Sequence, residues 1–93
     1  MFSPCIPLVP YPGAMKNFVY VLGSAGSRTY VGWTTNLERR LREHNSGKGA
    51  RSTRGRKWIL LHAERFATRP EAMRREWHLK RNRAFRKKLT AGL

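Results

Sequence analysis

Two β-rich apolar runs near the start of the chain, residues 18–22 and 29–33, constrain its fold more than any other feature. The residues between them include Gly23 and Gly26, which are typical of a tight turn. Two such runs joined by a short glycine-containing loop predict a β-hairpin. A third apolar run at residues 58–66 predicts another strand, so we expect a small, mostly antiparallel, three-stranded sheet.

Capping signals indicate where the helices begin. Thr35 precedes Glu38 by three residues, and Thr68 precedes Glu71 by three residues. In a capping box the threonine side chain accepts from the backbone N–H of the glutamate, and the glutamate side chain bonds back. With the helices in place, the expected order is β-β-α-β-α-α, an α/β (α+β) fold with helices flanking the sheet. The predicted helices are residues 37–45, 69–81 and 83–89.

The first fourteen residues differ from the rest of the chain. They contain four prolines and no charged residue. Prolines at this density disfavour both helix and central strand. We therefore expect residues 1–14 to be a disordered arm or a non-native start, and residues 15–93 to form one small domain.

The net charge of +15, from 20 basic and 5 acidic residues, predicts a polyanionic partner. Nucleic acid is favoured, because arginine matches phosphate oxygens in a bidentate way. An anionic membrane surface is less favoured, since no long amphipathic helix places basic residues opposite a broad apolar face, and no membrane partner is expected. No apolar run approaches the roughly 20 residues of a transmembrane helix. Cys5 is the only cysteine, which excludes a disulfide framework and a cysteine-based zinc site. This pattern favours the cytoplasm.

Residues 46–57 carry three glycines and five basic residues, which predicts a mobile basic loop. Its side chains and those of the last helix are expected to contact backbone phosphates without reading bases. The predicted nucleic-acid-binding residues are Lys48, Arg51, Arg54, Arg56, Lys57, Arg83 and Lys87.

Glu76 falls within the expected apolar stripe of the helix at residues 69–81. That stripe consists of Ala72, Met73, Trp77 and Leu79. A charge facing a core or cleft is costly unless it is paired or bound. The residues alone leave two interpretations open: an ion pair with Lys80 four residues on, or a metal ligand that faces a phosphate.

Four other side chains are candidates for the same site. Arg40 and His44 are one turn apart and border the apolar face of the helix at 37–45. Each also has a structural explanation, as a solvated or capping cation and as a boundary histidine bonded to the backbone. Tyr20 and Tyr30 lie on the two predicted hairpin strands and could share one face, although strand tyrosines usually serve packing alone.

The ordered set of these residues resembles the GIY-YIG nuclease superfamily. The motifs are Phe18-Val19-Tyr20, Tyr30-Val31-Gly32, Leu37-Glu38-Arg39-Arg40-Leu41, His44-Asn45 and a later helical Glu76. Within the superfamily the chain is most similar to small single-domain bacterial proteins related to the N-terminal nuclease domain of a nucleotide-excision-repair protein, over about residues 15–89. The resemblance implies a small antiparallel sheet flanked by helices.

The resemblance also implies a metal-dependent endonuclease that hydrolyses phosphodiester bonds, with DNA favoured over RNA and with low sequence specificity unless a protein partner supplies it. Glu76 would bind Mg²⁺ or Mn²⁺, and Arg40 would hold the scissile phosphate. Tyr30 or His44 would help deprotonate the attacking water, which Tyr20 would orient.

The alternative is a non-catalytic nucleic-acid-binding module that keeps the fold. Two departures favour it. Trp33 stands where some members have a lysine, and Lys87-Lys88 stands where many have an asparagine.

Overall fold

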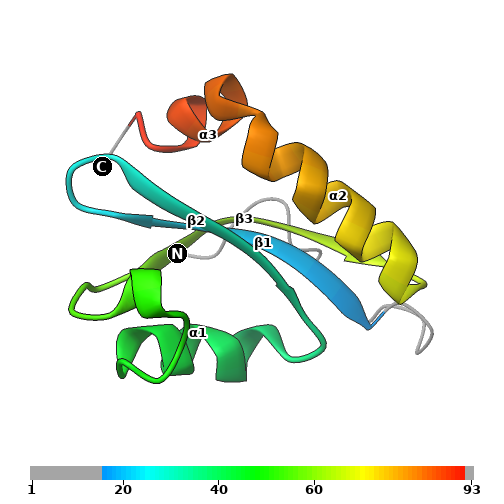
Figure 1. Ribbon diagram of the computed structural model, residues 1–93, viewed down its shortest axis with the longest axis horizontal. Helices are drawn as coiled ribbons and strands as arrows, with labels where there is room; N and C mark the ends of the chain where they lie inside the picture. Colours follow the sequence, from blue (N-terminus) through cyan, green and yellow to red (C-terminus); the bar gives the residue numbers. More distant parts are fainter. Residues whose placement is uncertain (1–15, 92–93) are drawn as a thin grey trace.

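The computed structural model describes residues 16–91, so the predicted arm at residues 1–14 lies outside the described residues. The order of elements is the expected β-β-α-β-α-α, with one additional 3₁₀ turn, η1 (Figure 1). The elements are β1 (Asn17–Ser24), β2 (Arg28–Thr34), α1 (Leu37–Asn45), η1 (Arg51–Thr53), β3 (Ile59–Phe66), α2 (Arg69–Arg81) and α3 (Arg83–Leu89).

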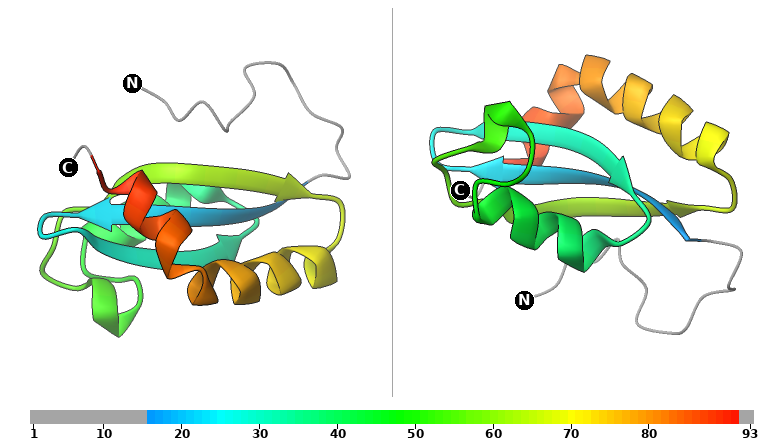
Figure 2. Two further views of the ribbon diagram at one scale, coloured as in Figure 1. Left: turned by 90° about the horizontal axis from the view of Figure 1, so that it is seen from above. Right: turned by 60° about the horizontal axis from the view of Figure 1, so that its bottom comes forward.

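The three strands form one antiparallel sheet in the order β2-β1-β3. β2 is therefore an edge strand, beside the central β1. Helix α1 covers one face of the sheet, and α2 and α3 cover the other (Figures 1 and 2). A side chain at the outer edge of β2 can consequently contact residues of α1 from one face and residues of α2 or α3 from the other.

The hairpin is longer than the apolar runs that predicted it. Pairing continues to Ser24 opposite Arg28, because polar residues at strand ends can complete a ladder as well as apolar ones. The turn then falls at residues 25–27. Gly26 has φ +81° and Ser27 has φ +59°, so both residues are in the left-handed region. Glycine adopts this conformation without steric cost.

The core is divided between the two faces of the sheet, because alternate residues of a strand point to opposite sides. One cluster lies toward α2 and the other toward α1. The first consists of Val19, Val21, Val31, Ala72 and Leu79. The second consists of Tyr20, Leu22 and Trp58, with Leu37 and Leu41 packed against it.

The capping box of α2 is confirmed, whereas that of α1 was wrong. Asn36 caps α1, and its side chain accepts from the backbone N–H of Arg39 at 3.0 Å. Asparagine caps a helix at least as well as threonine, and here it stands directly before the first helical residue. Glu38 is thereby one position too early to bond back, and it pairs with Arg42 at 3.7 Å.

The predicted apolar stripe of α2 was wrong at two positions. Met73 is 45% exposed and Trp77 is 51% exposed, and the Trp77 ring lies 3.7 Å from the Arg81 guanidinium carbon. The inward face instead repeats at three- and four-residue intervals through Ala72, Arg75, Glu76 and Leu79. Glu76 is thus on the inward face, as expected, although two of its predicted apolar neighbours are not.

Among residues 16–91, no helix combines the length and the apolar character that crossing a membrane requires.

Candidate active site

Tyr20 reaches the outer edge of the sheet by lying across Gly32. The two residues are directly opposite in the β1–β2 ladder. A Cβ atom at Gly32 would lie 2.6 Å from the Tyr20 hydroxyl oxygen and 3.1 Å from the Tyr30 ring. The missing side chain therefore makes the space that Tyr20 occupies, which gives a physical reason for the glycine of the Tyr30-Val31-Gly32 motif.

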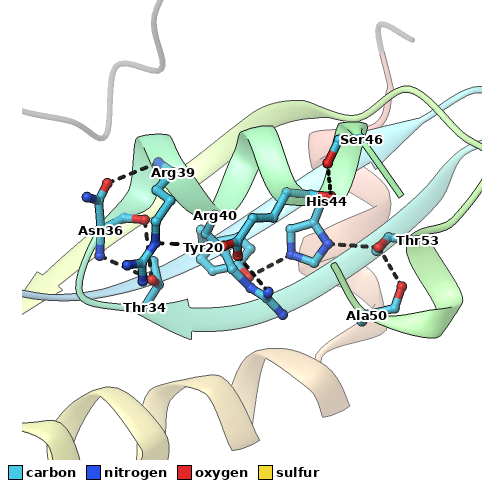
Figure 3. Close-up of polar contacts among 10 residues, drawn as sticks. Tyr20, Thr34, Asn36, Arg39, Arg40, His44, Ser46, Ala50 and Thr53 are labelled. Carbon is cyan, nitrogen blue, oxygen red and sulfur yellow. Dashed lines mark hydrogen bonds and ion pairs between the residues drawn. The ribbon is translucent and has the colours of Figure 1, made fainter. Parts of the chain in front are cut away.

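His44 meets that hydroxyl from the α1 side. Its side chain is fully buried, and its Nε2 lies 2.9 Å from the Tyr20 oxygen. Its Nδ1 lies 2.8 Å from Oγ1 of Thr53 in η1. Figure 3 shows these three residues in a row, joined by hydrogen bonds. Tyr30 completes the cluster, with its ring centroid 4.7 Å from that of His44.

The hydroxyl of Thr53 determines the direction of this chain of hydrogen bonds. It donates its single proton to the backbone carbonyl of Ala50 at 2.8 Å. It must then accept from His44, so Nδ1 carries the proton of the neutral imidazole. Nε2 is left as the acceptor, and Tyr20 donates to it.

Burial keeps both central groups neutral. Burial raises the pKa of the Tyr20 hydroxyl to about 12, against an ordinary 10.0. Burial also lowers the pKa of His44 below 6.5, and the nearby Arg40 guanidinium lowers it further. At neutral pH the site therefore contains a phenol and an uncharged imidazole, which can pass a proton from one to the other.

Arg40 lies on the same side of α1 and is held in place by Glu43. Its Nη1 donates to a Glu43 carboxylate oxygen at 3.0 Å, a closer contact than the 3.8 Å pair between Arg39 and Glu43. The Arg40 guanidinium also interacts with the Tyr20 hydroxyl. It is thus a partly buried cation beside the Tyr20–His44 pair.

Glu76 approaches from α2. Its side chain is 20% exposed and lies 3.8 Å from Lys80, so the ion pair considered from the sequence is present. The carboxylate is also near enough to Tyr20 to contribute to raising the pKa of that hydroxyl. The structure therefore brings Tyr20, Tyr30, Arg40 and His44 together and places Glu76 within electrostatic range of the group.

The turn of α2 before Glu76 is anchored to β3. Arg75 donates two hydrogen bonds to Glu64, at 2.9 and 3.0 Å, and His62 lies 2.6 Å from the same carboxylate. Burial acts to raise the pKa of Glu64, but the hydrogen bonds from Arg75 and His62 outweigh it and lower that pKa. A bidentate pair of this kind orients the helix on the sheet.

A metal ion at Glu76 would depend on ligands from outside the protein. Within residues 16–91, no three His, Cys, Asp or Glu side chains gather as a closed metal site would require. Mg²⁺ does not need such a site, because it commonly binds one or two carboxylates together with waters and substrate phosphates. A single inward-facing glutamate fits that mode.

Trp33, at the position where the resemblance implies that a lysine can stand, has a packing role. It is half-buried and packs against the core cluster on the α2 side, with the Arg69 guanidinium carbon 5.0 Å from its ring. Arg69 thus supplies a cation at this place, although it comes from α2 instead of β2.

The segment predicted as a mobile basic loop contains η1 and is attached to the core. Thr53 is fully buried, and its carbonyl accepts from the Trp58 indole N–H at 2.8 Å. Arg56 bonds the carbonyl of Ala25 in the hairpin turn at 3.3 Å. The other predicted phosphate contacts are at least partly exposed: Lys48, Arg51, Arg54, Lys57, Arg83 and Lys87.

Sequence reasoning missed Thr53 and Gly49. A Cβ atom at Gly49 would lie 2.5 Å from Nδ1 of His44, so this glycine makes room for the imidazole. Both residues lie in a glycine- and arginine-rich stretch that has no periodic pattern. A buried threonine in such a stretch leaves no signal that the sequence alone could reveal.

The GIY-YIG catalytic domain model matches residues 16–89. The chain belongs to the GIY-YIG family. The match spans nearly all of the described residues and includes every member of the candidate site.

Relatives of this GIY-YIG domain include a UPF0213 protein of Natronomonas pharaonis, 46% identical over 84% of this chain and 94% of the relative. A UPF0213 protein of Halobacterium salinarum is 48% identical over 67% and 82%. The solution NMR structure of a UPF0213 protein from Bacillus halodurans is 38% identical, with a TM-score of 0.49, and the match covers 81% of this chain and 82% of that one.

Proposed function

We propose that this GIY-YIG domain is an endonuclease that uses Mg²⁺ or Mn²⁺ to hydrolyse phosphodiester bonds of nucleic acid. DNA is favoured over RNA, in the cytoplasm, with little sequence specificity unless a protein partner supplies it. The observation that carries the proposal is the buried chain of hydrogen bonds from Tyr20 through His44 to Thr53, with the Arg40 guanidinium beside its Tyr20 end. Packing alone does not require a directed row of hydrogen bonds with a cation beside its first member.

His44 is the base in this proposal, acting through Tyr20. Both imidazole nitrogens are already hydrogen-bonded, to Tyr20 and to Thr53, so an attacking water cannot contact them directly, whereas the Tyr20 oxygen keeps a lone pair that can accept a proton. Tyr20 is only 1% exposed, so the proposal requires a water to enter beside its oxygen. The water gives its proton to the Tyr20 oxygen as Tyr20 gives its own proton to Nε2 of His44. Tyr20 is neutral before and after this transfer, which suits a hydroxyl whose pKa is about 12.

Arg40 and a divalent ion held by Glu76 would stabilise the negative charge on the reacting phosphate. Arg40 donates to the phosphoryl oxygens through its forked N–H groups. Glu76 would hold the divalent ion, which would supply Lewis-acid stabilisation of the charge that develops on the phosphate. Tyr30 is partly exposed beside His44 and helps to position the substrate.

The second candidate function is a non-catalytic nucleic-acid-binding module. The specific observation that favours it is the contact between Glu76 and Lys80, because a carboxylate engaged in an ion pair needs no metal. The pair is loose at 3.8 Å and its lysine is 55% exposed, so Lys80 can move away when a cation competes.

Glu76→Gln and Lys80→Gln separate the two functions. Each removes the ion pair and should cost only a few tenths of a kcal/mol, as helix pairs at this spacing do (about 0.2–0.5). If Glu76 holds the metal, Glu76→Gln abolishes plasmid nicking in Mg²⁺ or Mn²⁺ while Lys80→Gln keeps it. Nicking by wild type must also stop in EDTA.

Two results would count against the endonuclease. Glu76→Gln that nicks at the wild-type rate removes the metal role of that residue. Wild type that binds DNA and RNA but cuts neither, under any divalent ion, supports the binding module.

A further inference from the structure

Two adjoining pockets lead away from the candidate active site along the hairpin. One, of about 260 Å³, is lined by Arg28, Thr29, Tyr30, Ser52, Trp58 and Arg86. The other, of about 280 Å³, is lined by Ser27, Thr29, Arg83, Arg86, Lys87 and Thr90. They share Thr29 and Arg86, which are hydrogen-bonded to each other, so the two pockets are neighbours along the hairpin. Together we call them the groove, which extends from Tyr30 to α3.

Elements from both faces of the sheet meet at this groove. Ser52 belongs to η1, on the α1 side, and Arg86 belongs to α3, on the α2 side. Figure 1 shows the two elements on either side of the hairpin, at the end where its turn lies. The basic segment at residues 46–57 and helix α3, both predicted from the sequence to contact phosphates, therefore border the same groove beside β2.

The lining of the groove suits a phosphate. It contains four basic side chains and four hydroxyl groups of Ser and Thr, besides the Tyr30 phenol, and it has no carboxylate. Guanidinium, ammonium and hydroxyl groups are the donors that proteins direct at nucleic-acid backbone oxygens. A cationic or apolar ligand without several acceptors would leave many of these donors unused.

The basic residues of the groove differ in how far they are already engaged. Arg86 is committed to the fold: it donates to Thr29 at 3.0 Å, to the carbonyl of Leu79 at 3.1 Å and to that of Lys80 at 2.8 Å. Within residues 16–91, the side chains of Arg83 and Lys87 make no hydrogen bond or ion pair. Arg86 thus has a structural role in the lining of the groove, while Arg83 and Lys87 are available to a ligand.

We propose that this groove binds a backbone phosphate of the same nucleic-acid strand whose scissile phosphate lies at Arg40. The inference rests on the proposed function. Its basis is that the groove begins at Tyr30, which also belongs to the candidate active site. Tyr30 lines the groove and also lies 4.7 Å from His44 between ring centroids, so a strand leaving the site past Tyr30 enters the groove. Arg83 and Lys87 then hold the strand in register while the neighbouring phosphate reacts.

The test compares adjacent lysines of α3. Lys87 lines the groove and Lys88 does not, although both are exposed and carry the same charge. Binding of a short DNA duplex is measured over a range of salt concentrations in EDTA, where no cleavage occurs. Lys87→Gln and Arg83→Gln should each reduce the slope of log K against log salt by about 0.9, the value for one lost phosphate contact, and Lys88→Gln should leave it unchanged.

A second arm distinguishes an internal phosphate from a strand end. The same duplex is offered with and without 5′-terminal phosphates, and the difference between Lys87→Gln and wild type should be equal for both. A difference that appears only with terminal phosphates overturns the proposal, as does a Lys88→Gln slope that falls as far as that of Lys87→Gln. Because binding is measured without cleavage, a wild type that never cuts removes the proposed function and leaves this result standing.

Discussion

The hydroxyl of Tyr20 donates to Nε2 of His44 at 2.9 Å, although the two residues lie 24 positions apart, on β1 and α1. The contact is buried, and its direction follows from Thr53 on the far side of the imidazole. A proton accepted by Tyr20 can therefore be exchanged for one delivered to His44.

Thr53 acts as a positioning residue, so Thr53→Val and Thr53→Ser should differ. Valine has nearly the shape of threonine but cannot accept from Nδ1 of His44. Leaving that buried N–H unpaired should cost about 1–3 kcal/mol of unfolding free energy. It also frees the imidazole to move its proton to Nε2, where Tyr20 can no longer donate, so nicking should fall by about 10-fold to 100-fold.

Thr53→Ser is the matched control, because it keeps the hydroxyl and should retain most of the nicking rate. Urea denaturation measures the stability of both variants, and nicking is measured across pH. If Thr53→Val nicked at the wild-type rate with the wild-type pH profile, Thr53 would have a purely structural role.

Gly32→Ala should displace Tyr20. The new methyl group would stand 2.6 Å from the hydroxyl oxygen, and the buried ring has no space into which it can withdraw. Overpacking of this kind costs about 1–3 kcal/mol, and here it also breaks the bond to His44. We expect nicking to be lost while the far-ultraviolet circular dichroism of the sheet and helices is kept.

Gly26→Ala provides the comparison. Gly26 lies in the hairpin turn with nothing within 4 Å of the added methyl group, so its cost comes from the positive φ alone. It should lower the melting temperature without abolishing nicking. Equal loss of nicking in both variants would show that the hairpin as a whole, and not the space for Tyr20, is what the site requires.

Stability should fall when the pH drops below about 6.5, because of His44. Burial lowers the pKa of this imidazole in the folded state, so the unfolded chain binds the proton first. Unfolding is then favoured as pH decreases from 6.5 toward the lowered folded-state pKa, by up to about 1.4 kcal/mol per pH unit. Above 6.5 both states are neutral at this position, and the effect is absent.

Thermal melts from pH 7.5 downward measure this dependence in wild type, His44→Gln and His78→Gln. The slope should disappear in His44→Gln and persist in His78→Gln, since His78 is exposed on α2. Glu64 and Glu43 have lowered pKa values, so their contributions are lost only below pH 4.5 and do not overlap. An unchanged slope in His44→Gln would contradict a buried, neutral imidazole.

The sequence by itself determined the strands, the α-helices and their order. The hairpin, the capping box formed by Thr68 and Glu71, and the boundaries of all three helices depend on residues within a few positions of one another. Such local interactions are encoded in neighbouring residues, so pattern and propensity are enough to predict them. The inward position of Glu76 also followed, because it depends only on helical spacing.

Only the tertiary structure decided which candidates meet. It turned Met73 and Trp77 to the surface, because α2 contacts the sheet along a narrower face than the apolar residues had indicated. It brought Thr53 from an irregular segment to His44, and it set Gly32 beneath Tyr20 through the register of two strands. These contacts join residues distant in the chain, and they form only where the packing of the whole domain outweighs the entropy of closing the loops between them.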